Sequence, residues 1–290
     1  MPELPEVQTT ASGLHSFVQK LKIKDVWTDY NSPYFKGSET IKDPRYFQYF
    51  KKGVVGKKIL HVSRRAKNIL INLSGNLTII IHMKMTGHLL YGDYNKSDPY
   101  NRFIHFIIYL SNGKNIELSD VRKFAKVALV PTDTIHDSIH LKGIGPEPLE
   151  KSFTFEKFLA RIYTKRNGKI KPTLMDQSIV AGIGNIYADE SLWKAGIHPE
   201  SLVKDVSCVV LKKLFDSIKI TLSKGIDLGG ASMSDYRNIH GEKGRFQEQH
   251  KVYQRKGERC SKKGCGGIIV RSVVAGRGTH FCNGHQKLFK

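Results

Sequence analysis

The chain has 290 residues, 40% of them hydrophobic, which excludes an intrinsically disordered protein and allows two packed domains with a substantial core. Lys and Arg outnumber Asp and Glu by 47 to 26, so the formal net charge is +21. A folded surface with this excess of positive charge attracts a polyanion, and nucleic acid is the first candidate.

The sequence contains no long apolar segment. Its longest apolar run, Leu77–Ile81, is far too short to span a bilayer, which makes an anionic membrane the weaker candidate for a partner. The first twenty residues contain acids and lack the basic and then apolar pattern of a secretion signal. We therefore expect a cytoplasmic monomer that is associated with the nucleoid.

The predicted elements begin with a helix over residues 5–20, with Pro and Glu in its first turn, as the helix dipole favours. Short runs rich in β-branched and aromatic residues follow, separated by Gly, Asn, Ser and Pro. About seven strands at this spacing predict a β-sandwich or barrel. We expect these strands within residues 21–30, 57–65, 68–74, 77–83, 102–110, 114–120 and 125–131.

The pattern changes near residues 141–149, where Gly and Pro predict a domain boundary. Helical periodicity follows in residues 154–165, 171–180, 185–196 and 203–224. The fold class expected is α+β. Its domains are expected to be an N-terminal β-sandwich at 1–140, a helical domain at 141–250 and a C-terminal β-hairpin module at 251–290.

Two features of the helical half need separate mention. Residues 229–250 are polar and rich in Gly, and a stretch of this length in a compact domain indicates a functional or mobile loop. Cys208 lies within the last helical run, where we predict a buried core thiol in preference to a metal ligand or nucleophile.

The remaining three cysteines gather near the C-terminus in a C-x4-C and C-x2-H pattern. Two close ligand pairs separated by a short hairpin are typical of a closed tetrahedral zinc site. We predict one structural Zn²⁺ on Cys260, Cys265, Cys282 and His285, with His280 as a rival fourth ligand. Four protein ligands leave no position for a substrate, so this zinc would hold the hairpin rigid.

Polar residues at two turns are candidates for binding phosphate. The predicted hairpin carries Arg271 and Arg277, whose guanidinium groups suit bidentate contacts, although solvated surface arginines have the same composition. Gly182 and Gly184 precede Asn185 at a predicted helix start, where backbone N–H groups can approach an anion. A plain packing turn between helices is the alternative.

The first residues raise a chemical possibility. If Met1 is removed, Pro2 becomes a terminal secondary amine, and an α-amino group titrates near 7.7–8.0, far below lysine. Such an amine attacks an aldehydic sugar carbon to give an iminium, for which Glu3 could move protons. The alternative is an ordinary helix start with Pro and acids in its first turn.

Eight blocks of sequence, in order and across essentially the whole chain, resemble bacterial formamidopyrimidine-DNA glycosylases. They are MPELPEV, RRAKNIL, IHMKMTGHL, DVRKFA, GIGPEPL, KPTLMDQSIVAGIGNIYADESLWKAGIHP, GGASMSDYRNIHGEKGRFQ and VVAGRGTHFC. The resemblance implies an N-terminal β-sandwich with Pro2 at a cleft, a helix-two-turn-helix domain and a zinc finger. It also implies a repair enzyme that excises oxidised purines from damaged double-stranded DNA and then cuts the strand by β- and δ-elimination.

The resemblance also implies roles for residues. Pro2 would be the Schiff-base nucleophile and Glu3 the general acid and base, with Lys67 near the lesion and Arg277 linked to δ-elimination. Asn185 and Arg277 would grip phosphates. A wedge that fills the gap left by a flipped base would consist of Met85, Arg122 and Phe124. Weaker DNA contacts would come from His82, His105, Arg166, Tyr253 and Arg271.

The chain departs from the family pattern at several positions. The first cysteine pair is C-x4-C where C-x2-C is usual, and His285 stands where a fourth Cys is usual. Ala231 replaces a common Ser in the loop expected to cover the extruded base. Two alternative functions remain: an endonuclease VIII-like glycosylase for oxidised pyrimidines, and a non-catalytic zinc-ribbon DNA-binding protein.

Overall fold

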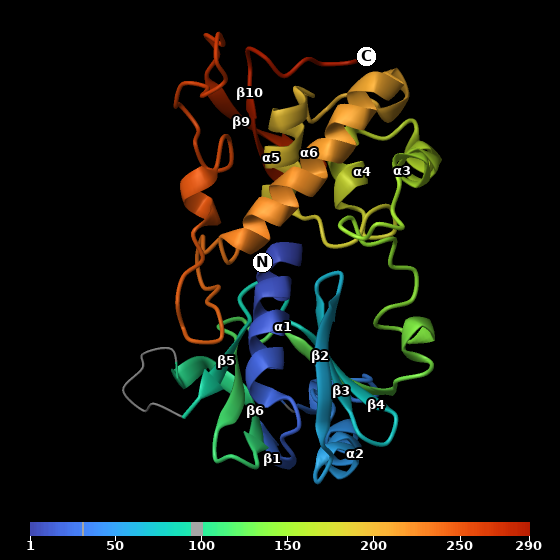
Figure 1. Ribbon diagram of the computed structural model, residues 1–290, viewed down its shortest axis with the longest axis vertical. Coiled ribbons are helices and arrows are strands. Elements are labelled where there is room, and N and C mark those ends of the chain that lie inside the picture. Colours follow the sequence, from blue (N-terminus) through green and yellow to red (C-terminus); the bar gives the residue numbers. More distant parts are fainter. Residues whose placement is uncertain (31, 94–100) are drawn as a thin grey trace. The chain divides into compact units, whose positions relative to one another are not determined.

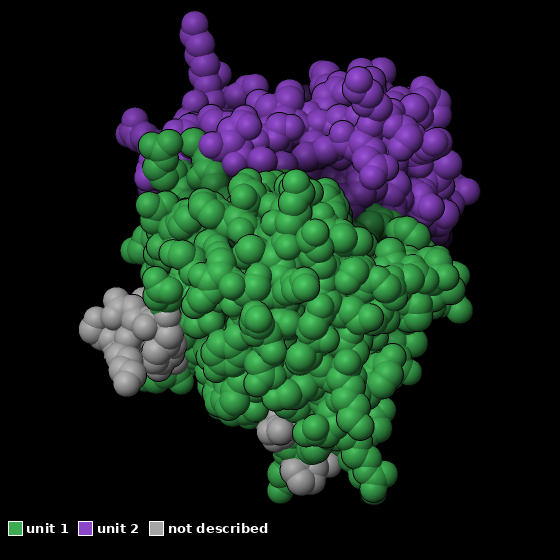
Figure 2. Space-filling view, turned by 60° about the horizontal axis from the view of Figure 1, so that its bottom comes forward, with its two compact units in different colours: residues 1–142, 228–245 green, residues 143–227, 246–290 purple. Residues whose placement is uncertain are grey.

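The computed structural model describes residues 1–30, 32–93 and 101–290, and the chain forms two units. Unit 1 comprises residues 1–142 and 228–245, and unit 2 comprises residues 143–227 and 246–290 (Figure 2). The chain therefore enters unit 2 and returns to unit 1 for one loop before it completes unit 2. The predicted domain boundaries at residues 140 and 250 stay a prediction, because the two units do not show which parts of the chain fold independently.

Unit 1 begins with helix α1 (Leu4–Val18), whose apolar residues recur at helical spacing. Val7, Ala11, Leu14 and Val18 have no exposed surface. The helix packs against strands β2 (Ile59–Arg65) and β3 (Asn68–Leu73) (Figure 1). Tertiary packing of one face, more than intrinsic propensity, therefore holds the helix that carries the N-terminal residues.

Two antiparallel four-stranded sheets form the rest of the core of unit 1, in the orders β1-β6-β7-β5 and β2-β3-β4-β8. Both sheets, helix α1 and helix α2 (Pro44–Val54) contribute to one cluster of buried side chains, which includes Phe50, Ile69 and Phe106. The predicted N-terminal β-sandwich is confirmed. The strands are β1 (Ile23–Thr28), β2 (Ile59–Arg65), β3 (Asn68–Leu73), β4 (Leu77–His82), β5 (His88–Gly92), β6 (Ile104–Leu110), β7 (Asn115–Ser119) and β8 (Lys126–Pro131).

Two elements of unit 1 were missing from the sequence-based prediction. Strand β5 is short and follows closely on a turn, so its run of alternating residues is weak. Helix α2 (Pro44–Val54) begins at Asp43, whose carboxylate accepts the backbone N–H groups of Arg45 and Tyr46 at 2.7 and 3.2 Å. Short 3₁₀ turns lie at η1 (Pro33–Phe35), η2 (Asn101–Phe103) and η3 (Ile135–Asp137).

Unit 2 combines helices with a two-stranded hairpin, as predicted. Helix α5 packs against α4, α6 and strand β10. The elements are α3 (Phe155–Ile162), α4 (Ile170–Met175), α5 (Asn185–Ala195), α6 (Cys208–Asp227), β9 (Ile269–Val274) and β10 (Arg277–Cys282), with 3₁₀ turns η4 (Tyr163–Lys165), η5 (Val203–Asp205) and η6 (Phe246–Gln249).

The prediction that Cys208 is a buried core thiol is wrong. Cys208 is the first residue of α6, and its side chain is exposed. The buried face of this helix starts one turn later with Leu211 and continues through Leu214 and Ile218. Helical spacing predicted the buried face of α6 correctly, but the segments packed against that face do not cover the first turn of the helix.

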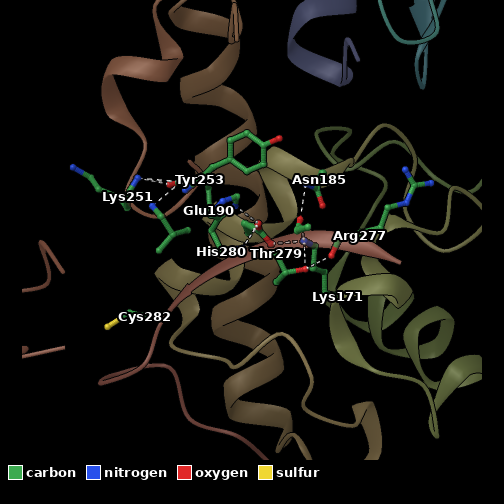
Figure 3. A network of polar contacts seen from close by, with 12 residues as sticks. Lys171, Asn185, Glu190, Lys251, Tyr253, Arg277, Thr279, His280 and Cys282 are labelled. Carbon is green, nitrogen blue, oxygen red and sulfur yellow. Dashed lines mark hydrogen bonds and ion pairs between the residues drawn. The ribbon is translucent and has the colours of Figure 1, made fainter. Parts of the chain in front are cut away.

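A buried ion pair joins α4 to α5 and to the hairpin (Figure 3). The Lys171 ammonium lies 2.7 Å from an Asp189 carboxylate oxygen, and both side chains are almost completely buried. Lys171 also donates to the hydroxyl of Thr279 at 2.7 Å, and Asp189 accepts the backbone N–H of His280 at 2.8 Å. Strand β10 is therefore fixed by charge-assisted hydrogen bonds from two helices.

The neighbouring Glu190 performs a similar task on the segment before the hairpin. Its buried carboxylate accepts the backbone N–H groups of Lys251, Val252 and Tyr253 at 2.9–3.0 Å. Burial raises the pKa of Glu190 despite these three donors.

Among the described residues, no helix is long and apolar enough to cross a membrane.

The Lys171–Asp189 pair generates a stability prediction. Lys171→Met leaves the Asp189 carboxylate buried without its cation, so the free energy of unfolding should fall by about 3–5 kcal/mol. Urea unfolding measures this loss. The double variant Lys171→Met/Asp189→Leu should recover most of it, because both charges then leave the interior. A single variant as stable as the parent chain would contradict a structural role for the pair.

Candidate active site and nucleic-acid interface

The N-terminal residues are held tightly at the start of α1. Pro2 and Glu3 are buried, and the Glu6 carboxylate accepts the backbone N–H of Glu3 at 2.7 Å. This contact is one half of a capping box, in which the third residue of a helix reaches back to its N-cap. The residue predicted to be a nucleophile and the residue predicted to move protons therefore share a fixed backbone conformation.

Glu6 also fixes the loop at residues 228–245, which returns to unit 1. Its second carboxylate oxygen accepts the backbone N–H of Ala231 at 2.7 Å, and its carbonyl oxygen accepts the Tyr236 hydroxyl at 3.0 Å. Gly230 has φ +83°, and a Cβ there would lie 2.7 Å from the Glu6 side chain. Only glycine fits this close approach. The loop expected to cover an extruded base is thus tied to the helix that starts at Leu4.

Lys67 and His82 lie near each other in the second sheet of unit 1. Lys67 follows the left-handed residue Ala66 in the turn between β2 and β3. Burial, followed by the charges of Lys84 and Lys67, lowers the pKa of His82 to about 3. The imidazole is therefore neutral at pH 7. Its Nδ1 accepts the backbone N–H of Lys84 at 3.0 Å, so the proton is on Nε2, which can donate to an anion.

The three predicted wedge residues form one exposed cluster. The Arg122 guanidinium donates to the Met85 sulfur at 3.1 Å and lies 4.4 Å above the Phe124 ring. Met85 and Phe124 are each 45% exposed, so the cluster presents apolar surface to the solvent. A flat cation on a flat ring presents a surface on which a base can stack.

Asp120 sets the turn that carries this cluster. Its buried carboxylate accepts the backbone N–H of Ala125 at 2.7 Å, the Tyr30 hydroxyl at 3.0 Å and the hydroxyl of Thr86. The backbone N–H of Arg122 is 3.3 Å away. Because one carboxylate joins three segments of unit 1, the wedge sits on a rigid support.

His105 lies on β6, with its Nδ1 2.9 Å from the Asp29 carboxylate. The Lys123 ammonium is 3.1 Å from the same carboxylate. The side chain of His105 is 8% exposed, so only a small part of the ring could reach a DNA backbone. Its predicted DNA contact stays a prediction.

In unit 2, three predicted phosphate ligands gather around Gly278 of the hairpin. The Asn185 amide donates to the Gly278 carbonyl at 2.9 Å. A Cβ on Gly278 would lie 3.1 Å from the Arg271 guanidinium, so this side chain extends across the two strands. Arg277 begins β10 and is exposed (Figure 3). The buried Lys171, which donates to the same carbonyl at 3.2 Å, adds positive charge beneath them.

Two more predicted contacts of unit 2 lie outside this group. The ring of Tyr253 packs edge-on against His280, with 5.2 Å between the ring centroids. Arg166 is exposed and lines a hollow of about 430 Å³ together with Lys165 and Thr173. Its backbone carbonyl accepts the N–H of Lys204 at 2.9 Å, which fixes the turn that presents it.

The predicted metal ligands converge. Ligand atoms of Cys260, Cys265, Cys282 and His285 all lie within 4.8 Å of one another. His285 Nδ1 is 3.4 Å from the Cys260 sulfur, and its Nε2 is 3.0 Å from the Trp193 carbonyl, which orients the ring. The rival His280 points elsewhere, with its Nδ1 3.7 Å from Asp189.

The surroundings of the cluster fit a metal centre. Backbone N–H groups of Gly267 and Gly284 donate to Cys265 and Cys282 at 3.3 Å, which suits thiolate sulfur. A Cβ on Gly267 would lie 2.7 Å from the Cys282 sulfur, so a larger residue would crowd the site. Three thiolates and one imidazole are a typical ligand set for a structural zinc ion, which is usually four-coordinate and tetrahedral.

Several organising residues were not found by sequence reasoning. Glu6, Asp120 and Glu190 are buried carboxylates, and each binds backbone N–H groups of another segment. Glu6 left a local signal, because an acid three residues after Glu3 fits a capping box. The acid–acid pair Asp189 and Glu190 lies within a helical run, where nothing in the sequence distinguishes a buried carboxylate from a solvated one.

Comparisons with known proteins identify relatives over the full length of the chain. The family model for the formamidopyrimidine-DNA glycosylase N-terminal domain matches residues 1–127, and the model for the H2TH domain of the same glycosylase matches residues 144–237. A formamidopyrimidine-DNA glycosylase from Pelotomaculum thermopropionicum is 39% identical over 288 residues, which cover 99% of this chain and 100% of that protein.

Solved structures are similarly close. The Lactococcus lactis Fpg in complex with DNA that contains an abasic site is 35% identical, with a TM-score of 0.84 over 97% of both chains. The complex of the same enzyme with DNA that contains an oxidised pyrimidine gives a TM-score of 0.83 at 35% identity, over 97% of this chain and 98% of that one. By its sequence and its fold, this chain belongs to the formamidopyrimidine-DNA glycosylase family.

Proposed function

We propose that this protein is a bifunctional DNA glycosylase and AP lyase of base excision repair, which removes oxidised purines such as 8-oxoguanine and formamidopyrimidines from double-stranded DNA. The observation that carries the proposal is the fixed, buried pair of Pro2 and Glu3 at the start of α1, in a family member with a net charge of +21. In a protein that only bound DNA, this pair would do no more than start the helix.

The nucleophile is the secondary amine of Pro2, which becomes available after removal of Met1. Its nitrogen attacks C1′ of the damaged nucleotide, the bond from C1′ to the base breaks, and the base leaves with the electron pair and a proton. Loss of the proton from the amine nitrogen gives a neutral aminal. The C1′–O4′ bond then breaks, O4′ takes the electron pair and a proton, and the nitrogen lone pair forms the C1′=N bond of a cationic iminium. Glu3, the next residue, supplies and accepts the protons.

The iminium then draws electrons from the sugar. A base removes a proton from C2′, and the 3′ phosphate leaves, which is β-elimination. Lys67 is the proposed helper at this step, because it lies in a tight turn close to His82, whose pKa is lowered by burial and by the charges of Lys84 and Lys67. Arg277 is proposed to assist δ-elimination, in which the 5′ phosphate leaves.

DNA binding needs a filler for the gap left by the flipped nucleotide, since unstacking a base costs a few kcal/mol. The exposed cluster of Met85, Arg122 and Phe124 has the flat surfaces for this role. Asn185, Arg271 and Arg277 are proposed to grip phosphates. His82, His105, Arg166 and Tyr253 are proposed as weaker contacts.

We propose one structural Zn²⁺ on Cys260, Cys265, Cys282 and His285. When bound, the ion would supply rigidity and no chemistry, since its four ligands all come from the protein. The hairpin that carries Arg271 and Arg277 would then be fixed from both ends, by the metal ligands and by the Lys171–Asp189 pair.

A trapping assay tests the reaction. Sodium borohydride reduces the iminium to a stable amine, so duplex DNA containing 8-oxoguanine should become covalently attached to the enzyme. Because a relative was solved with DNA containing an oxidised pyrimidine, a thymine glycol duplex is the second substrate. We expect the stronger adduct with 8-oxoguanine. An adduct mainly with thymine glycol would favour the endonuclease VIII-like alternative, and no adduct would favour a DNA-binding protein.

Two substitutions separate catalysis from binding. Glu3→Gln should slow base excision by roughly 10²–10⁴-fold, as expected for loss of a general acid and base. Pro2→Gly should abolish excision. Both variants should bind an uncleavable duplex as tightly as the parent chain, and Ser12→Ala on the exposed side of the same helix should behave like the parent in both assays. Normal excision by Pro2→Gly would remove the nucleophile assignment.

Metal analysis tests the zinc site. The purified chain should contain one zinc ion, and Cys282→Ser should lose it and lower the affinity for DNA, because the hairpin loses its anchor. His285→Cys should retain zinc, since it completes a set of four thiolates. Equal zinc content in Cys282→Ser and the parent chain would contradict the ligand assignment.

A further inference from the structure

Unit 1 contains a pocket that the proposed reaction does not use. It has a volume of about 570 Å³ and is lined by Tyr30, Phe35, Lys42, Lys84 and Lys123, with Arg122 and Phe124 of the wedge cluster on its wall. This volume lies in the range of pockets that bind small ligands or parts of larger ones. The pocket combines aromatic rings with several ammonium groups.

Lys42 is the fixed element of the pocket. Only 8% of the residue is exposed, and its ammonium donates to the Lys123 carbonyl at 2.6 Å. The ammonium also lies 5.0 Å from the centre of the Phe35 ring and 5.3 Å from that of Tyr30. The hydrogen bond and two cation–π contacts hold a buried cation in place without neutralising it.

The positive charge of the pocket is not balanced. Asp29, the one acidic residue among the described residues that line the pocket, is already engaged by Lys123 at 3.1 Å and His105 at 2.9 Å. Within the described part of the chain, the Lys84 ammonium forms no ion pair. Burial lowers the pKa of both Lys42 and Lys84. The Asp120 carboxylate partly offsets this effect on Lys42, whereas neighbouring lysines lower the pKa of both groups further. An anion in the pocket would relieve this repulsion.

The backbone of the pocket is strained at two of its lysines. Lys84 has φ +55° and Lys123 has φ +52°, in the left-handed region that non-glycine residues rarely adopt. This conformation is strained for a residue with a side chain, and strain of this kind gathers at functional sites. Both turns therefore aim a lysine at the same space at an energetic cost.

We propose that this pocket binds one nucleotide of the undamaged DNA strand, with its phosphate between Lys42 and Lys84 and its base against the exposed ring of Phe35. The inference rests on the proposed function. The wedge enters the position that the damaged base vacates, so the residues beside and behind it meet the strand opposite. Phe35 is 43% exposed, which leaves a ring face for stacking. The pocket would thus report the presence of a second strand.

Lys42→Met tests the proposal in the full-length chain. Binding is measured by fluorescence anisotropy to DNA that contains a tetrahydrofuran abasic analogue, either as a duplex or as the damaged strand alone. The variant should bind the duplex about tenfold more weakly at low salt, and the slope of log affinity against log salt should fall by about 0.9, the value for one phosphate contact. Binding to the single strand should not change.

Controls separate this effect from a general loss of charge or fold. Lys24→Met removes an exposed lysine elsewhere in unit 1 and should weaken duplex and single strand equally or not at all. Lys42→Arg should restore the salt slope. If Lys42→Met does not fold, Lys84→Met provides the same test, because within the part of the chain that the structure describes the Lys84 ammonium forms no ion pair that the substitution would break.

Three results would overturn the proposal. One is equal weakening of duplex and single-strand binding by Lys42→Met. Another is an unchanged salt slope with the duplex. The third is tight binding of free deoxycytidine monophosphate to the parent chain that Lys42→Met abolishes while duplex binding is unaffected, which would assign the pocket to a soluble nucleotide. These measurements need no catalysis. Failure of the pocket proposal can therefore be distinguished from failure of the proposed reaction in the trapping assay.

Discussion

The carboxylate of Glu6 is the interaction on which the proposed chemistry depends. It binds the backbone N–H of Glu3 on one side and that of Ala231 on the other. A terminal amine is normally mobile, because the first residues of a chain have few constraints. Here the residue that would carry the amine is buried directly before helix α1, and the Glu6 side chain also holds the loop expected to lie over the extruded base. Nucleophile and loop are therefore positioned by one group.

Buried carboxylates act as organisers elsewhere in this basic chain. Asp120 supports the turn of the wedge, Asp189 with Lys171 fixes strand β10, and Glu190 binds the segment before the hairpin. Each carboxylate accepts several N–H or O–H groups, which offsets the cost of removing its charge from water. Cations such as Arg122 and Arg277 remain exposed on the elements that these acids fix. In these examples, buried carboxylates hold the elements in place, and exposed basic residues on the same elements are available for DNA.

The sequence predicted the strands and helices that have strong periodicity, but it failed where packing dominates. Strand β5 and helix α2 were missed, since a short run and an amphipathic helix rich in aromatic and basic residues gave weak patterns. Cys208 was expected to be buried because it follows the helical period, whereas the neighbours that would cover it are absent at the helix end. Periodicity shows which face of a helix or strand is buried, but it does not show how far along the element neighbouring residues cover that face.

By itself, the sequence determined the α+β architecture, the basic surface and the paired Cys and His spacing, because these depend on local periodicity, composition and ligands close in the chain. Tertiary structure decided which histidine joins the cysteines, since His285 faces Cys260 while His280 faces Asp189. It also decided that Lys42 and Lys84 share one pocket. Such choices depend on segments brought together by packing, and their separation along the chain leaves no local pattern to read.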